Sequence, residues 1–275
     1  MITLASDFGS PYPAAMKGVL LSRADDPRLV DVAHDLPRGD PRSAAFWLRF
    51  VLPEFPPAVH LAVVDPGVGT DRAAVAVRAG DHALVGPDNG SLVPPARALA
   101  EASADAGADP EIEVFAVRTD DPRSSTFHGR DVFAPAAAAV HEAGVERMDA
   151  LDSLDPVDEY ESVLFSDARV ETGRAVGEVL VVDDFGNAVT NVPGSFLDGH
   201  RGGSVTVRTS GGEASVPVVE TFADAPAGDP LVTVGSHGYV ECDVNRGRGD
   251  EAFDLAPGRS VVLSFDEEET QLLPT

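Results

Sequence analysis

The spacing of apolar residues changes character near residue 175, and this change restricts the fold more than any other feature of the chain. Up to about residue 165, short β-branched runs alternate with alanine-rich segments of helical spacing, which favours a parallel or mixed sheet with helices on its faces. Beyond residue 175, strand-like runs follow one another with Gly, Asp and Pro between them, as in a small β-barrel or sandwich. We therefore expect an N-terminal α/β sheet domain followed by a smaller C-terminal β-barrel domain.

The expected elements of the first part are short strands with helices between them. The strands are ITLAS (2–6), LVDVA (29–33), VHLAVV (59–64), AVAV (74–77), ALVG (83–86) and IEVFAV (112–117), and the helices lie around 16–22, 43–51, 96–102 and 132–143. In the second part the strands are VGEVLVVD, AVTNV, SVTVRT, ASVPVV, LVTVG, YVECDV and SVVLSF. The acidic stretch 149–174 has poor periodicity and is the expected linker, so we place the α/β domain at 1–165 and the barrel at 175–275.

The composition is that of a globular protein. With 275 residues, 43% of them hydrophobic, the chain is long enough for one large or two ordinary domains with buried cores. No apolar run approaches the ~18 residues of a membrane span, and MITLASDFGS lacks the basic start of a signal peptide, so we expect a cytoplasmic protein. The single Cys242 excludes an internal disulfide and is expected to be a packing residue.

The charge balance is strongly acidic, with 46 Asp and Glu against 20 Lys and Arg and a net charge of −26. Lys17 is the only lysine. Such a chain lacks the basic footprint of a nucleic-acid binder. Because the acidic residues are interspersed with apolar ones rather than gathered in a tail, they indicate an acid-coated folded surface, as in proteins of salt-accumulating halophiles.

The stretch VVDPGVGTDR (63–72) is the most specific local signal for a site. Asp65 ends an apolar strand, Pro66 halts the strand ladder, and Gly67 and Gly69 allow a sharp turn or a close approach to a ligand. A plain strand-to-loop turn is the alternative. It is not a phosphate-binding P-loop, because no Lys-Ser/Thr pair follows the glycines.

Other polar residues also follow expected strands, where ligands bind in α/β sheets. Asp7 in DFGS is suited to accept hydrogen bonds from a diol such as a ribose, or else it forms an ordinary Asp turn. His34 and Asp35 in DVAHDLPRGD brace a loop or, with Asp7, Asp65 and His128, hold a metal such as Mn, Fe or Zn. No pair at HxxxH or HxH spacing supports the metal site.

The segment SSTFHGRDVFAP (124–135) leads into a helix, and its His128 is suited to hydrogen bonding or proton transfer near neutral pH. Scaffolding of the loop is the alternative. In the second part, Phe185 in VVDDFGNAVTNV is suited to stack on a flat ring, while GSHGYVECDVN offers Ser236 and Glu241 for a pocket. Ordinary turn and strand-end roles are the alternatives there.

Taken together and in order, these motifs resemble one family. The set DFG…MKG…DVAHDLPRGD…FP…VVDPGVGTDR…VGPDNGSL…STFHGRDVFAPAAA…VDDFGN…GSHGYVE is similar to the S-adenosyl-L-methionine (SAM) hydroxide adenosyltransferases, or SAM hydrolases, which are relatives of the fluorinating and chlorinating SAM enzymes. The resemblance implies a homotrimer of two-domain subunits that bind SAM between neighbours. It also implies conversion of SAM and water to adenosine and L-methionine, with SAM as substrate and without a metal or other cofactor.

The resemblance also implies roles for individual residues. The family's catalytic set falls on Asp65, Arg72 and His128. The implied adenosine contacts are Asp7 at the ribose and, in the second part, Phe185, Asn187, Ser236, Glu241 and Val244.

Two features favour hydrolysis over halogenation. Halogenating relatives carry Tyr where this chain has Asp65, and they have an inserted loop where only 73–85 separates Arg72 from GPDNG. The segment DFGSPYPAAMKG is shorter than in the family and has prolines at 11 and 13, so its loop is expected to differ. A metal-dependent phosphoesterase and a non-catalytic adenosine-binding protein are the alternative functions.

Overall fold

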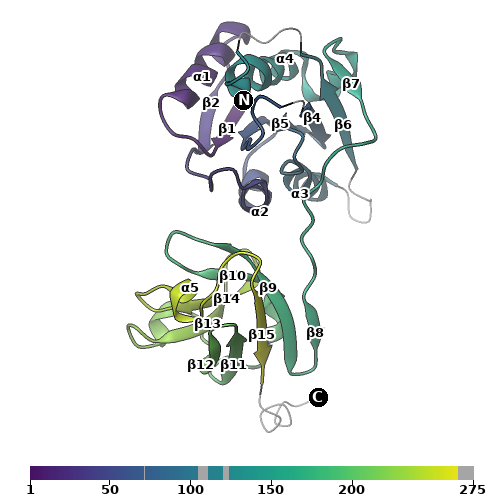
Figure 1. The fold of residues 1–275 in the computed structure, drawn as a ribbon. Helices are drawn as coiled ribbons and strands as arrows, with labels where there is room; N and C mark the ends of the chain where they lie inside the picture. Colours follow the sequence, from purple (N-terminus) through teal and green to yellow (C-terminus); the bar gives the residue numbers. More distant parts are fainter. Residues whose placement is uncertain (71, 105–110, 120–123, 266–275) are drawn as a thin grey trace. The chain divides into compact units, whose positions relative to one another are not determined.

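The computed structural model describes residues 1–70, 72–104, 111–119 and 124–265. The chain divides into two compact units, Met1–Leu164 and Phe165–Thr275 (Figure 1). Each unit has its own sheet, and the expected α/β class with a barrel-like second part is confirmed.

The sheet of the first unit is mixed. Its described strands are β1 (Ile2–Ser6), β2 (Leu29–Ala33), β3 (Val59–Val63), β4 (Ala74–Ala79), β5 (His82–Pro87), β6 (Ile112–Val117) and β7 (Leu154–Pro156). They lie in the order β2-β1-β3-β5-β4-β6-β7, in which β2, β1, β3 and β5 are mutually parallel and β4, β6 and β7 join through antiparallel pairs. The carboxyl ends of β1 and β3 therefore meet at one edge of the sheet.

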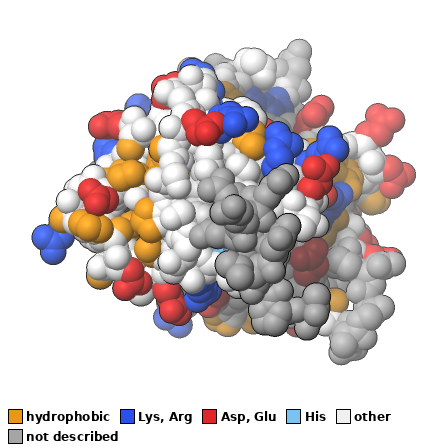
Figure 2. Space-filling model, turned by 90° about the horizontal axis from the view of Figure 1, so that it is seen from below, with side chains coloured by type: hydrophobic (Ala, Val, Ile, Leu, Met, Phe, Trp, Pro, Cys, Tyr) orange, Lys and Arg blue, Asp and Glu red, His pale blue; other side chains and the backbone are white. Residues whose placement is uncertain are grey.

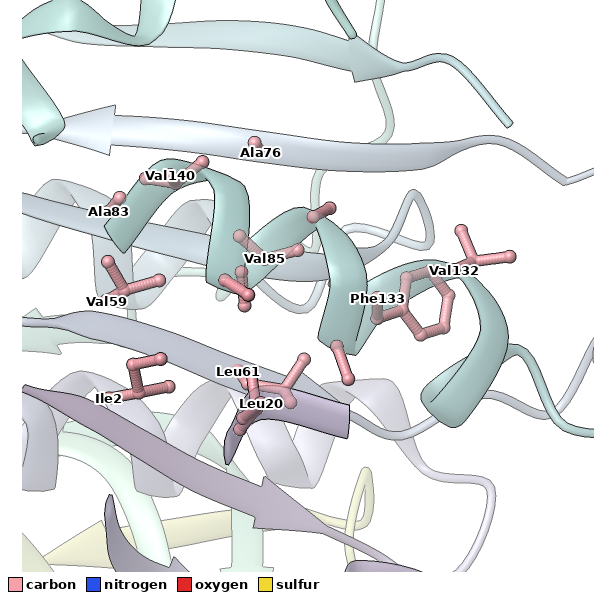
Figure 3. Packing of buried hydrophobic residues seen from close by; sticks show 14 of the residues in the cluster. Ile2, Leu20, Val59, Leu61, Ala76, Ala83, Val85, Val132, Phe133 and Val140 are labelled. Atoms are coloured by element: carbon pink, nitrogen blue, oxygen red, sulfur yellow. The ribbon is translucent and has the colours of Figure 1, made fainter. Parts of the chain in front are cut away.

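Helices cover both faces of this sheet. Helices α1 (Tyr12–Arg23) and α4 (Ala134–Ala143) pack together, as do α2 (Pro41–Val51) and α3 (Val93–Ser103) (Figure 1). Figure 3 shows the core beneath α4, in which Leu61 and Val85 of the sheet lie close to Phe133 and Val140. Burial of apolar side chains of this size contributes roughly 1.5–3 kcal/mol each.

Strand β3 is buried on both faces. Val59, Leu61 and Val63 belong to the core shared with α1 and α4, while Ala62 and Val64 belong to the core shared with α2 and α3. A strand covered on both sides reads as a continuous apolar run, which is why VHLAVV lacks alternation. The first polar side chain after this run is Asp65, so it emerges where the two cores end.

The second unit is a nearly closed antiparallel barrel. Its strands are β8 (Arg169–Glu171), β9 (Arg174–Val182), β10 (Ala188–Pro193), β11 (Ser204–Thr209), β12 (Gly212–Pro217), β13 (Pro230–Val234), β14 (Tyr239–Val244) and β15 (Ser260–Ser264). They follow the order β12-β11-β15-β9-β10-β14-β13, and a bridge between Val218 and Val232 joins the two ends. A short helix, α5 (Gly249–Ala252), packs against β14.

The stretch 149–174 is more structured than a plain linker. It contributes β7 to the edge of the first sheet and β8 to a hairpin with β9. No helix in the described part of the chain is long and apolar enough to cross a membrane. On the face drawn in Figure 2, acidic side chains are scattered among basic and apolar ones rather than collected in one patch.

Candidate functional site

Asp65 and Arg72 form an ion pair at the carboxyl end of β3. Arg72 Nη2 lies 2.5 Å from Asp65 Oδ1, and 4% of the Asp65 side chain and 17% of the Arg72 side chain are exposed. The Gly67 N–H also donates to Asp65 Oδ1, at 3.1 Å. The other carboxylate oxygen, Oδ2, has no hydrogen-bond partner among the described residues, so it remains available to an outside donor such as water.

Gly67 is the position that lets Arg72 reach Asp65. A Cβ on Gly67 would lie 1.5 Å from Arg72 Nη2 and 2.6 Å from its Cζ, so any side chain there would displace the guanidinium. The loop is closed by a turn in which Thr70 donates to the Gly67 carbonyl from both its N–H and its hydroxyl, at 3.1 and 2.7 Å.

If Asp65 and Arg72 have the roles that the family resemblance implies, Gly67→Ala should lower kcat by about 10-fold or more, because Arg72 can no longer pair with Asp65. Gly18→Ala is the matched control, since a Cβ at this exposed helical position meets nothing within 4 Å. Steady-state kinetics with SAM checks both variants. Equal rates for the two variants would mean that the close approach at Gly67 does not matter for turnover.

Asp7 lies at the same edge of the sheet. In the parallel pairing of β1 with β3, Ser6 is opposite Val63, so Asp7 follows directly after β1 and Asp65 lies two residues past the end of β3. The Gly39 N–H donates to Asp7 Oδ2 at 2.7 Å, and Gly39 in turn approaches the VVDPG turn. The Asp7 turn and the Asp65 loop are thus connected through the loop after β2.

His128 precedes a π-helical turn, η2 (Gly129–Phe133), that leads directly into α4. This turn packs against β3, β5 and α1, and the His128 ring stands edge-on to Phe133 with centroids 6.4 Å apart. Single π-helical turns inside helices are frequent at functional sites. The position of His128 is consistent with a role at the end of β3.

The segment that carries His128 contacts both the Asp65 loop and the Asp7 turn. Gly69, at φ 83°, lies against the Ser125 carbonyl, which a Cβ on Gly69 would approach to 3.1 Å. Phe8, beside Asp7, and Phe127, beside His128, pack edge-on at 6.2 Å, and both contact Tyr12. The segments that carry Asp7, Asp65, Arg72 and His128 therefore meet at one edge of the first unit.

The prolines of the shortened segment fit this arrangement. Helix α1 begins at Tyr12, directly after Pro11, and Pro13 is buried in its first turn. Proline is well tolerated in the first turn of a helix, where backbone N–H groups have no intrahelical partner. Tyr12, the first residue of the helix, packs edge-on against Phe8 and Phe127.

Residues of the second unit that sequence analysis selected line one cavity, of about 750 Å³. The cavity is lined by Phe185, Asn187, Ser236, Glu241 and Val244, together with Asp183, Glu220, Phe222, Arg246 and Arg248 among others. Phe185 is 79% exposed, so it presents an uncovered aromatic face. A cavity of this size suits a small ligand, and its polar lining residues can fix the orientation of that ligand.

Asp183 orders the turn that carries two of these residues. Its Oδ1 accepts from the backbone N–H groups of Phe185 and Asn187, and its Oδ2 accepts from Asn187 Nδ2, each at 2.9 Å. Because a carboxylate only accepts, the amide nitrogen of Asn187 must face Asp183. The Asn187 Oδ1 is left as an acceptor for a ligand N–H, such as the exocyclic amine of adenine.

Glu241 is held in place by a neighbouring histidine. His237 Nε2 lies 2.8 Å from Glu241 Oε1, and their side chains are 7% and 10% exposed. Gly235 leaves room for the pair, since a Cβ there would lie 2.3 Å from Glu241 Oε1. The carboxylate is therefore positioned before any ligand arrives.

Asp243 lies two residues further along β14, fully buried, and opposes Asn187 when the β10–β14 pairing is continued by one residue. Burial, together with the negative charges of Glu241 and Asp183, raises the pKa of Asp243 to about 9. The side chain is thus a neutral carboxylic acid at pH 7.

This protonation makes stability depend on pH. Between the ordinary Asp pKa and about 9, the folded state keeps a proton that the unfolded chain releases, so the free energy of unfolding falls as pH rises. Between pH 5 and 8 we expect Asp243 to lower it by at most about 4 kcal/mol. Asp243→Asn should remove this decrease, as measured by chemical denaturation at both pH values. An unchanged pH dependence in the variant would contradict the assignment.

Three of the five residues proposed as metal ligands have other partners. His34 uses Nδ1 with Ser6 and Nε2 with Asp31, Asp7 is bound by Gly39, and Asp65 by Arg72. Within the described residues, no three His, Cys, Asp or Glu side chains are grouped as a metal site. For His34, loop bracing is the role that its contacts support.

Comparison with known proteins identifies the family. The model of the SAM hydroxide adenosyltransferase N-terminal domain matches residues 2–150, and that of the SAM hydroxide adenosyltransferase C-terminal domain matches residues 177–262. The chain belongs to the SAM hydroxide adenosyltransferase family. The resemblance found in the sequence motifs is thereby confirmed.

Related SAM hydroxide adenosyltransferases align over nearly the whole chain. The (R)-S-adenosyl-L-methionine hydrolase of Thermus thermophilus is 43% identical over 94% of this chain and 97% of its own length. The enzyme of the same name from Salinispora arenicola is 40% identical over 96% and 97%. A crystal structure of an uncharacterized conserved protein from Thermotoga maritima superposes with a TM-score of 0.80 at 29% identity, covering 96% of this chain and 100% of that one.

The structure adds one residue, Asn89, to the site at the end of β3, which was not selected from the sequence motifs. Asn89 donates from Nδ2 to the Val64 carbonyl at 2.8 Å, and its Oδ1 accepts from the N–H and hydroxyl of Ser91. It therefore braces the backbone directly before Asp65. The signal was present in the PDNG motif, but only the fold shows that this loop lies beside the end of β3.

Proposed function

We propose that this protein hydrolyses SAM to adenosine and L-methionine by attack of an activated water at C5′. The observation that supports this best is the cavity that gathers Phe185, Asn187, Ser236, Glu241 and Val244, all of them residues matched to adenosine contacts. Its relatives carry the name (R)-S-adenosyl-L-methionine hydrolase, which supports the same reaction and the (R) sulfonium epimer as substrate.

In the proposed mechanism Asp65, Arg72 and His128 activate the water. Free water, with a pKa of ~15.7, is a poor nucleophile, so its proton must be accepted as the C–O bond forms. The unpartnered Oδ2 of Asp65 and the His128 ring position the water and accept or relay its proton. Arg72, paired through Asp65 Oδ1, stabilises the developing hydroxide character. The neutral sulfur of methionine leaves from the opposite side of C5′.

Two effects of the pocket assist this step. A sulfonium cation and a hydroxide-like nucleophile combine into neutral products, so a site that excludes water favours the less charged transition state. Alignment of water, C5′ and sulfur at about 3–3.5 Å supplies a further large share of the rate. In this proposal Asp7 holds the ribose, Asn187 accepts from the adenine amine and Phe185 stacks on the ring.

We also propose that the active assembly is a homotrimer in which a SAM site takes residues from neighbouring subunits. The family resemblance supports this arrangement. SAM is the substrate, and the mechanism requires no metal or other cofactor. A cytoplasmic location and adaptation to high salt remain predictions from the sequence, supported by the net charge of −26.

The proposal is tested by incubating the protein with each sulfonium epimer of SAM in high salt, with and without EDTA and halide, followed by chromatography. We expect adenosine and methionine from the (R) epimer, unchanged by EDTA, and no 5′-halo-adenosine. Activity lost in EDTA and restored by Mn or Zn would instead favour the metal-dependent phosphoesterase. Adenosine binding without methionine release would favour a non-catalytic binding protein.

A further inference from the structure

A chain of side-chain hydrogen bonds runs from Lys17 to the turn that carries Asp7. Lys17 Nζ donates to Asp31 Oδ2 at 2.6 Å, and Asp31 Oδ1 lies 3.0 Å from His34 Nε2. Partial burial alone would raise the pKa of Asp31, but the hydrogen bonds from Lys17 and His34 outweigh it and lower that pKa. Asp31 is therefore an anion that fixes the outer nitrogen of the His34 ring.

The inner end of this chain closes the turn around Asp7. His34 Nδ1 lies 2.7 Å from Ser6 Oγ, and the Ser6 hydroxyl donates to the Phe8 carbonyl at 3.0 Å. The Ser6 hydroxyl therefore lies between the Phe8 carbonyl and the His34 ring and contacts both. Ser6 is fully buried, so these contacts are made away from solvent.

The same loop also sets the direction of the Asp7 side chain. Asp7 lies between Ser6 and Phe8, so the hydrogen bond that joins them spans its backbone. The Leu36 N–H donates to the Ser6 carbonyl at 3.2 Å, and the Gly39 N–H holds Asp7 Oδ2 at 2.7 Å. The segment that begins at His34 thus fixes both the backbone and the carboxylate of Asp7.

The order Asp31–His34–Ser6 has the composition of a nucleophilic triad, but its geometry does not suit that chemistry. The serine is 0% exposed, and its oxygen is enclosed between the Phe8 carbonyl and the His34 ring. No substrate carbon can approach this oxygen. The arrangement therefore serves to hold a structure in place.

We propose that His34 is a positioning residue for substrate: through Ser6 it holds the turn from which Asp7 hydrogen-bonds the ribose hydroxyls, and Asp31 with Lys17 holds His34. This inference rests on the proposed function, because it assigns Asp7 to the ribose. The single lysine of the chain, Lys17, is the residue that pairs with Asp31.

The test compares two substitutions of His34, each of which keeps a polar group at the position of only one of the two ring nitrogens. The amide of Asn is as many bonds from Cα as Nδ1, so His34→Asn keeps a group facing Ser6. The amide of Gln matches Nε2, so His34→Gln keeps the contact with Asp31 and loses the one with Ser6. Ser22→Ala, which removes a hydroxyl of α1 bonded to the Val19 carbonyl, is the control.

The measurement is calorimetric binding of adenosine, 2′-deoxyadenosine and 3′-deoxyadenosine to the full-length protein. We expect wild type to prefer adenosine over at least one deoxy analogue by about 10-fold or more, the usual worth of a hydrogen bond to a charged group. Asp7→Asn and His34→Gln should lose most of this preference. His34→Asn and Ser22→Ala should keep it.

The outcomes separate the inference from the function on which it rests. If Asp7→Asn loses the preference and His34→Gln keeps it, the positioning role is wrong and the ribose assignment stands. If Asp7→Asn also keeps it, the ribose assignment and the inference both fail. If His34→Gln weakens all three ligands equally, His34 supports the fold in general and the inference is overturned.

Discussion

Asp65→Ala lowers kcat for SAM hydrolysis by ~10²-fold or more, the range usual for a positioned acid–base group. The substitution removes the carboxylate to which we assign the water and leaves the Arg72 guanidinium without its ion-pair partner. Binding of adenosine should stay close to wild type, because the residues assigned to the base line the cavity of the second unit. Stopped assays for methionine release and calorimetry with adenosine measure the two quantities separately.

The control for this variant is a more exposed ion pair elsewhere on the same sheet. Arg78 on β4 and Glu113 on β6 pair at 2.5 Å across neighbouring strands, away from the end of β3. Glu113→Gln should change kcat little and stability by at most about 1 kcal/mol, as for exposed pairs. His128→Ala should lower kcat to a similar extent as Asp65→Ala. Turnover near wild type in both catalytic variants would refute the proposed site.

The edge of the first sheet shows what a sequence can and cannot predict. The apolar run before Asp65 predicted a buried strand, and the position of Asp7 after another strand predicted that both would reach the same edge. The need for glycine at position 67 could not be predicted, because it arises from contact with the guanidinium of Arg72, five residues later. The brace at Asn89 was hidden too, since it depends on β5 lying beside β3.

The cavity of the second unit was predictable only through the family resemblance. Phe185 and Asn187 lie some fifty residues before Ser236 and Glu241, and they meet because β10 pairs with β14. Strand composition predicts that a barrel forms but not which strands are neighbours, since many pairings bury the same apolar face. The burial of Asp243 could not be predicted from the sequence, because an Asp in a strand of an acidic chain is expected to lie on the surface.

The strongest test of the proposed assembly is complementation between two inactive variants. Asp65→Ala disables the first unit, and Asn187→Ala removes the acceptor assigned to adenine in the second. Each variant alone should be nearly inactive at SAM concentrations below KM. Co-expression in equal amounts should restore activity to roughly a quarter of wild type, because in a cyclic trimer a site that draws on two subunits then receives both intact halves by chance.

This recovery is possible only if one SAM site takes its first-unit and second-unit residues from different subunits. If each subunit supplied both sets to its own site, every site in the mixture would carry one defect and no activity would return. Light scattering of the purified mixture should give the mass of a trimer. The control mixture of Asp65→Ala with His128→Ala, both in the first unit, should stay inactive, so recovery there would mean that the two halves of the site are wrongly divided.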